Sequence, residues 1–316
     1  MKKVLKERFA FVDILKILSI FLVVLFHILY EFNQNNALRP IGLVGVSLFF
    51  IISGFTLAKR YAYLESFSLK WFLKRYFKVS SVYYIAIIVI AVLFAIQTYP
   101  GKLLNNLFVH FFFLDYFFPQ YQYSIISPAW FLVPLMGLYI LFPYLNRFVK
   151  KYDWFIVVPF LIALIYRIYA GTFTSYSPLF FIADFCFGIY LAHHKKNLIL
   201  FVLPFLFLMA KPVMVIPFFI FLSLSYFNSW KSDSWAGLFL SENIILIFLF
   251  HESFMKVLFG KWEIYGLGIG ISLIILIFAT FLAWLISKTI QKNWAIINFK
   301  TSLLIVVLSA ISLMAE

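Results

Sequence analysis

The stretch FVDILKILSIFLVVLFH, residues 11–27, decides the fold class of this chain. It belongs to an apolar run from about residue 9 to 30, and a membrane-spanning helix takes about 20 residues. A basic N-terminus precedes the run, as in a secretory signal peptide. However, the run contains Asp13 and Lys16 and leads into ILYEFNQNN, which has no small-residue cleavage site. The sequence therefore predicts an uncleaved spanning helix.

The composition of the whole chain is that of an integral membrane protein. Of the 316 residues, 65% are hydrophobic and 12% are charged, whereas soluble domains have about a quarter of their residues charged. The 43 phenylalanines exclude a disordered chain, because such apolar content collapses. The single cysteine, Cys186, excludes an intramolecular disulfide and gives no support to a thiolate metal site. Without repeats or linkers, we expect one membrane domain over residues 1–316.

Apolar segments recur along the chain without the period-2 alternation of a transmembrane barrel, so we expect an all-α polytopic protein. At about 30 residues for each span and its loop, this length predicts about ten spans. The segments lie at about residues 9–30, 41–58, 79–98, 128–146, 154–170, 178–192, 197–210, 212–228, 243–259 and 267–287, with a possible eleventh helix at 301–315. Residues 99–127 are apolar but broken by polar residues, and we expect an outer re-entrant segment there.

The distribution of charge predicts the orientation in the membrane. The chain has 26 Lys and Arg against 12 Asp and Glu, a net charge of +14 that in a soluble protein would suggest nucleic acid as partner. With a cytoplasmic N-terminus, most basic residues fall in inner gaps, and Arg39, Lys102, Lys211 and Lys261 fall in outer ones. Because cytoplasmic loops are enriched in Lys and Arg, we expect this orientation, with membrane lipids and not nucleic acid around the chain.

The first span carries three ionisable residues, Asp13, Lys16 and His27, which we call the polar stripe. Such groups cost several kcal/mol at membrane depth unless they face a polar interior. Lys16 and His27 are separated by about 16 Å of helical rise and about three turns, so they share a face, and Asp13 can pair with Lys16 one turn away. One interpretation is a snorkelling lysine with a helix-packing histidine. The other is catalytic, since imidazole can accept a hydroxyl proton near neutral pH.

Two later segments have small or aromatic residues at marked positions. GVSLFFIISGF, residues 45–55, places Ser53 and Gly54 inside a bulky helix, which permits close backbone approach or a kink; a helix contact alone accounts for this. SPAWFLVPLMGLYILFP, residues 127–143, opens a span with Trp130, an interfacial anchor by default.

A basic row precedes the third span in LKWFLKRYFKVSSVYY, with Lys70, Lys74, Arg75 and Lys78 at helical spacing. The simpler interpretation is anchoring at the inner membrane surface. The functional interpretation is a phosphate-binding cluster, because Arg and Lys donors neutralise phosphate groups. The sequence leaves both open.

In order and spacing these motifs resemble the acyltransferase 3 family of membrane-bound O-acyltransferases, typified by bacterial enzymes that acetylate surface polysaccharides. Residues 11–27 are similar to its D-G-L-R-G and V-V-x-x-H, with the family's basic-x10-His spacing. Residues 45–55 resemble G-V-D-L-F-F-V-L-S-G-F, with Ser47 at the acidic position. Residues 75–83 resemble R-x-x-R-I-Y-P-x-Y, with one Arg replaced by Lys and the proline missing.

Later motifs extend the resemblance. Residues 130–143 are similar to W-S-L-x-V-E-x-x-F-Y-L-L-F-P, with Leu135 at the glutamate position. ADFCFGIYLA is similar to F-x-x-G-x-x-L-A, and IILIFLFHESF, which contains His251, is similar to Y-L-x-H. The late I-E-x-P is degraded at residues 290–293. The resemblance covers about residues 8–293.

The resemblance implies an acyl-CoA-dependent membrane O-acyltransferase. It implies transfer of an acyl group, usually acetyl, from cytoplasmic acyl-CoA to a hydroxyl of a cell-surface or lipid-linked glycan at the outer side. A bacterial plasma or inner membrane is then the expected location. The acceptor, the acyl chain and the oligomeric state are not specified by the sequence.

The resemblance also implies two groups of site residues. The donor-binding group comprises Lys74, Arg75 and Lys78, which hold the CoA phosphates at the inner mouth, together with Ser53 and Gly54. The catalytic group is the polar stripe: Lys16 meets the donor, Asp13 fixes Lys16, and His27 deprotonates the acceptor hydroxyl or carries the acyl group itself.

Three further candidates are Trp130, Arg167 and His251. His251 matches a motif but is equally compatible with a structural role, and Arg167 near an outer helix end can contact the acceptor or snorkel. His110 in the outer segment is a weaker candidate. We expect no metal, because His193 and His194 lie in an HHKK loop without nearby carboxylates in the sequence.

Two rival functions remain at this point. A polysaccharide or lipid-linked sugar exporter or flippase also uses broken helices and buried charges. The one-sided path from the basic row through Lys16 to His27, without an inverted repeat, favours the enzyme. A catalytically inactive scaffold gains weight from Leu135, from Gln291 and from the missing proline.

Overall fold

The computed structural model describes residues 9–33, 36–90, 103–114, 118–121, 127–169, 177–194, 199–209, 212–226, 245, 247–249 and 251. Over these residues the regular elements are α-helices and 3-10 helices, which agrees with the expected all-α fold class. The elements are α1 (Ala10–Asn33), η1 (Asn36–Leu38), α2 (Arg39–Arg60), α3 (Leu69–Ile90), α5 (Leu103–Phe111), η3 (Pro119–Tyr121), η4 (Ser127–Phe131), α6 (Leu132–Lys151), η5 (Asp153–Ile156), α7 (Val157–Tyr169), α8 (Pro178–His193), α9 (Ile199–Val202), η6 (Leu203–Met209), η7 (Pro212–Val215) and α10 (Ile216–Tyr226).

Within the described residues, three helical stretches are long and apolar enough to cross a membrane. They are Ala10–Tyr30, Arg39–Arg60 and Ala129–Lys151, and shorter apolar helices lie at Pro178–His193, Leu200–Met209 and Pro212–Tyr226. The ten-span topology, its orientation and the helix at 301–315 stay predictions, because residues 252–316 lie outside the described part of the chain. Within the segment expected to be re-entrant, α5 has only 9 residues and is too short to cross.

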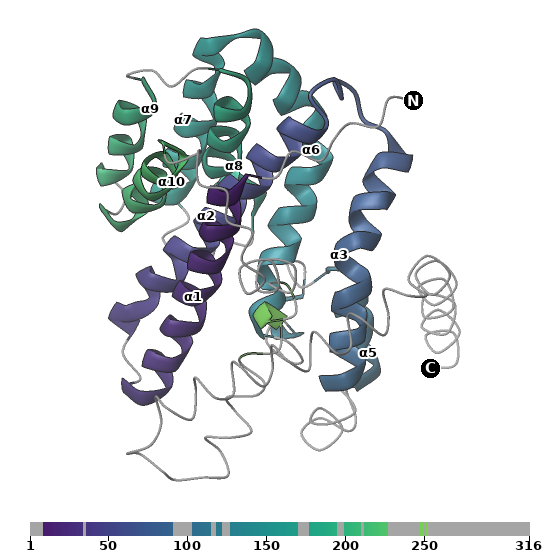
Figure 1. Cartoon of the computed structure of the whole chain (residues 1–316). Helices are drawn as coiled ribbons and strands as arrows, with labels where there is room; N and C mark the ends of the chain where they lie inside the picture. Colours follow the sequence, from purple (N-terminus) through teal and green to yellow (C-terminus); the bar gives the residue numbers. More distant parts are fainter. Residues whose placement is uncertain are drawn as a thin grey trace.

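The central helix of the described bundle is α8. It packs against α2, α6 and α7, while α1 covers α2 and α10 contacts both α1 and α2. In Figure 1, α6 stands between α2 and α3, and α5 lies beside one end of α3. Every residue from Phe180 to Tyr190 is buried. Such complete burial is expected for a helix that is apolar on nearly all sides.

Glycines permit the closest contact in the bundle, between α2 and α8. A Cβ atom at Gly54 would overlap the backbone oxygen of Phe185, and a Cβ atom at Gly188 would overlap that of Ile51. The two backbones therefore touch directly, as small residues allow in membrane helix pairs.

One end of the bundle collects the irregular connections and many basic residues. The end of α2, the start of α3 and the ends of α6 and α8 meet there, since Asn146 of α6 bonds to the α2–α3 loop and to His193 of α8. Lys59 and Arg60 therefore lie at the same end as Lys150 and Lys151. The orientation expected from the charge distribution places these four residues on one side of the membrane, and a common end of the bundle is compatible with that.

Candidate functional site

The polar stripe begins with an ion pair on α1. Lys16 Nζ lies 3.1 Å from Asp13 Oδ1, one turn away, which confirms the pairing expected from the spacing. The side chains are 28% and 15% exposed, respectively. Each charge thus compensates the other, which lowers the cost of holding both on an apolar helix.

At the other end of the stripe, His27 lies against a second histidine. Its half-buried ring is 4.9 Å from the ring of His251, centroid to centroid, at an interplanar angle of 64°. His251 is 4% exposed, and its Nδ1 lies 2.7 Å from the oxygen of Phe248. A carbonyl oxygen only accepts, so Nδ1 donates its proton to it. Two imidazoles therefore meet inside the bundle, and Nδ1 of one of them is held by a backbone oxygen.

The basic row on α3 divides into two faces. Lys74 and Lys78 are exposed, whereas Arg75 is half-buried and turns toward α2 and α6. Its guanidinium carbon lies 4.6 Å from the centre of the Tyr61 ring and its charge acts on the hydroxyl of Tyr139. Of the predicted donor-binding residues, the helix register thus sends Arg75 inward and leaves the two lysines outside.

Arg75 is the centre of a cluster from three elements. Tyr139 of α6 is hydrogen-bonded to Ser53 of α2, and Tyr61 follows the end of α2. We call Ser53, Tyr61, Arg75 and Tyr139 the Arg75 cluster. Within the described structure, Nε of Arg75 is buried and has no hydrogen-bond partner. A buried hydrogen-bond donor without a partner costs about 1–3 kcal/mol. The cluster is therefore suited to bind a hydrogen-bond acceptor such as a phosphate oxygen.

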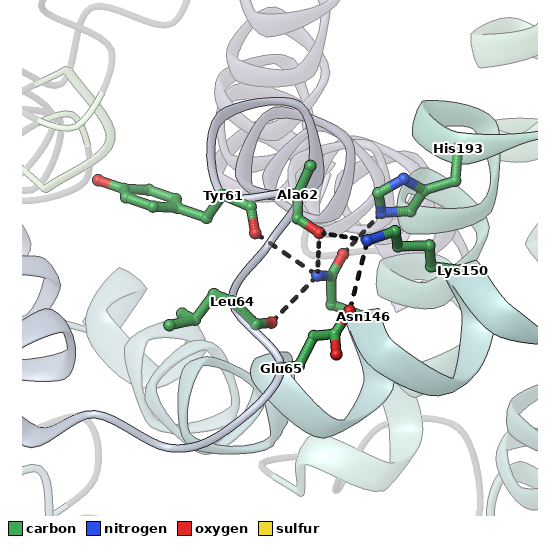
Figure 2. Close-up of polar contacts among 7 residues, drawn as sticks. All are labelled: Tyr61, Ala62, Leu64, Glu65, Asn146, Lys150 and His193. Atoms are coloured by element: carbon green, nitrogen blue, oxygen red, sulfur yellow. Dashed lines mark hydrogen bonds and ion pairs between the residues drawn. The ribbon is translucent and has the colours of Figure 1, made fainter. Parts of the chain in front are cut away.

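Beside this cluster, side chains of α6 and α8 hold the loop between α2 and α3 (Figure 2). Asn146 Nδ2 donates toward the backbone oxygens of Tyr61, Ala62 and Leu64, at 3.5, 3.4 and 3.2 Å. Its Oδ1 accepts from His193 Nε2 at 2.7 Å. Lys150 Nζ reaches the oxygen of Ala62 at 3.2 Å and Glu65 Oε1 at 3.4 Å. We call Asn146, Lys150 and His193 the loop clamp.

Charge and burial keep His193 neutral within this clamp. Burial is the main cause that lowers its pKa to about 4, and the positive charges of His194, Lys150 and Lys59 add to the effect. His194 itself lies 2.9 Å by Nδ1 from Asp153 Oδ1 and 2.7 Å by Nε2 from the oxygen of Val149.

Arg167 forms a buried ion pair with Asp184 of α8. Both side chains are fully buried, and Arg167 Nε also donates to the oxygen of Phe180 at 3.0 Å. The guanidinium lies between the rings of Phe180 and Phe207, 4.7 and 4.1 Å from their centres. The side chain therefore does not snorkel to a surface, and its position supports a structural role rather than contact with an acceptor.

The other predicted residues lie in packing positions. Gly54 faces the backbone of α8, as described above, and the half-buried ring of Trp130 lies 6.2 Å from that of Phe181. His110 is buried between Tyr83, whose hydroxyl is 3.0 Å from Nδ1, and the oxygen of Tyr121, 3.1 Å from Nε2. Burial lowers the pKa of His110 to about 4, so this ring is a neutral link between α3 and α5.

Residues 9–314 match the family model of the acyltransferase 3 domain, described as an acyltransferase domain. The chain belongs to the acyltransferase 3 family. The match confirms the resemblance found in the motifs, and it extends over nearly the whole chain. No curated protein and no solved structure matches the chain. Its family makes this protein an acyltransferase, and its apolar helices make it a membrane protein.

The structure clarifies one departure from the motifs of the acyltransferase 3 family. Ser47 occupies the position where the motif has an acidic residue, and its side chain interacts with the carboxylate of Asp184. In this acyltransferase 3 protein a carboxylate is therefore present at that place, but it comes from α8.

Sequence reasoning did not single out Tyr61, Tyr139, Asn146 or Asp184. Only Asp184 carries a clear signal, because an acidic residue inside the apolar run ADFCFG is costly unless it is paired. The other three are ordinary residues in the sequence, and only the packing of α2, α3 and α6 brings them to the Arg75 cluster and the loop clamp.

Proposed function

We propose that this acyltransferase moves an acetyl group from cytoplasmic acetyl-CoA to a hydroxyl of a cell-surface or lipid-linked glycan at the outer side of the membrane. The observation that carries the proposal is the contact of His27 with the buried His251. His27 lies on α1, the helix that also holds the Lys16–Asp13 pair. Paired imidazoles inside an apolar bundle fit proton transfer, because imidazole gains and loses a proton near neutral pH.

The donor enters at the end of the bundle that carries the basic residues. Arg75 offers a buried Nε–H to a phosphate oxygen, and the exposed Lys74 and Lys78 add positive charge on the same helix. Charge-assisted hydrogen bonds to phosphate are about twice as strong as neutral ones. The acyl end of the donor then extends along α1, past Lys16, toward His27.

The reaction requires one proton acceptor and one acyl transfer. His27 takes the proton of the acceptor hydroxyl while that oxygen attacks the thioester carbonyl carbon. The new C–O ester bond forms, the C–S bond breaks, and the proton held by His27 passes to the leaving CoA sulfur. No metal is part of this proposal.

The test is acetyl transfer in cells that lack the gene and receive one variant each. His27→Gln is expected to lower the rate at which the surface glycans are acetylated by about 10²–10⁴-fold, the usual contribution of a general base. His194→Gln, the same change away from the polar stripe, is the matched control and should leave transfer intact. Mass spectrometry of the glycans measures both.

Two outcomes contradict the proposal. Full acetylation by purified His27→Gln protein removes the catalytic role of this residue. Loss of the glycan from the surface of gene-deleted cells, with unchanged acetylation of the glycan that remains inside, indicates an exporter or flippase instead.

A further inference from the structure

The loop between α2 and α3 depends on Asn146 for its shape. Its backbone makes few bonds of its own: the N–H of Tyr61 donates to the oxygen of Leu57 at 2.8 Å, and that of Leu64 to the oxygen of Tyr61 at 2.9 Å. The carbonyl oxygens of Tyr61, Ala62 and Leu64 converge on the Asn146 amide. Asn146 is fully buried, although amides are mostly exposed in proteins.

The three carbonyl oxygens fix the orientation of that amide, because they only accept and therefore face its NH₂ group. This leaves Oδ1 to accept from His193 Nε2. A flipped amide would place its oxygen against three carbonyl oxygens. The observed orientation is therefore the one that satisfies both partners (Figure 2).

Tyr61 connects the loop to the Arg75 cluster. Its oxygen faces Asn146 at 3.5 Å, while its ring stands at 82° to that of Trp71, with centroids 5.7 Å apart, and supports the Arg75 guanidinium at 4.6 Å. A guanidinium on an aromatic face gains about 0.5–2 kcal/mol, and only if the ring is held in place. Movement of the loop would move this ring away from Arg75.

We propose that Asn146 is a positioning residue for the acyl donor. Resting on the proposed function, this inference holds that Asn146 sets the loop, the loop sets the Tyr61 ring, and the ring directs Arg75 toward an anionic phosphate oxygen. Asn146 itself does not touch the donor. Its loss then weakens donor binding while the chemistry at His27 continues.

The experiment measures the Kd of CoA and the KM and kcat for acetyl-CoA with the full chain in detergent. Asn146→Leu should raise both Kd and KM roughly tenfold, the factor that corresponds to about 1.4 kcal/mol, and should leave kcat nearly unchanged. Asn106→Leu is the matched control, since Asn106 is also buried but lies on α5. It should leave the Kd unchanged.

A double-variant cycle tests the route through Tyr61. Tyr61→Leu should weaken CoA binding, Tyr61→Phe should not, because it keeps the ring, and adding Asn146→Leu to Tyr61→Leu should cause little further loss. If Asn146→Leu does not fold, Asn146→Ser is measured in its place and should give an intermediate Kd, since it retains one donor.

The outcomes separate this inference from the function on which it rests. An unchanged Kd in Arg75→Gln overturns the donor site of the proposed function. A raised Kd in Arg75→Gln with a wild-type Kd in the Asn146 variant overturns the positioning role alone. Fully additive losses in the double variant also overturn it, because Asn146 would then act independently of Tyr61.

Discussion

Removing the carboxylate of Asp184 is expected to destabilise the protein by about 3 kcal/mol. In Asp184→Leu, the guanidinium of Arg167 stays fully buried and keeps only the oxygen of Phe180 as acceptor. Breaking a buried ion pair in this way costs about 3–5 kcal/mol. The rings of Phe180 and Phe207 continue to attract the cation, which offsets part of the loss and places the expected value at the lower end of the range.

The single cysteine provides the assay. Cys186 is buried on α8, two residues beyond Asp184, so a thiol-reactive fluorophore reports when the bundle opens. Asp184→Leu should react at a clearly lower temperature than the wild type. The double variant Arg167→Met/Asp184→Leu should recover most of the difference, because no charge is left buried.

Two results would refute this reasoning. If Asp184→Leu opens at the wild-type temperature, loss of the Asp184 carboxylate does not leave a costly unpaired charge on Arg167. If the double variant is no more stable than Asp184→Leu, the loss comes from packing and not from charge.

Three further predictions concern other parts of the bundle. The pKa of His193 is lowered to about 4 in the folded protein, so the unfolded chain binds a proton first as the pH falls below about 6.5. The stability measured by thermal unfolding should therefore fall between about pH 6.5 and 4, and His193→Gln should flatten this decline. Gly54→Ala should destabilise by about 1–3 kcal/mol, since its methyl group overlaps the α8 backbone; unchanged thermal stability would contradict the contact. Lys74→Gln combined with Lys78→Gln should weaken CoA binding less than Arg75→Gln alone and with a stronger dependence on salt; titration at low and high salt distinguishes the two.

Local features of the chain are those that the sequence predicts well. The helical fold class follows from apolar runs, and the pairing of Lys16 with Asp13 follows from their spacing on one helix. Both depend only on neighbours along the chain. The family, too, is readable from motifs, because their order and spacing are properties of the sequence itself.

Contacts between distant segments could not be derived in the same way. His27 and His251 each drew attention separately, but their contact depends on how two distant helices pack. Lys74, Arg75 and Lys78 share one basic row, and the rotation of α3 against α6 decides which of them turns inward. A pattern of residues on one helix does not contain that rotation.

The glycine contact between α2 and α8 limits how the enzyme can admit its two substrates. Helices whose backbones touch cannot be parted without opening a void in a densely packed interior, so the two move as one rigid body. Any movement that opens the bundle must then come from the elements packed around this fixed pair, and not from separation of α2 and α8.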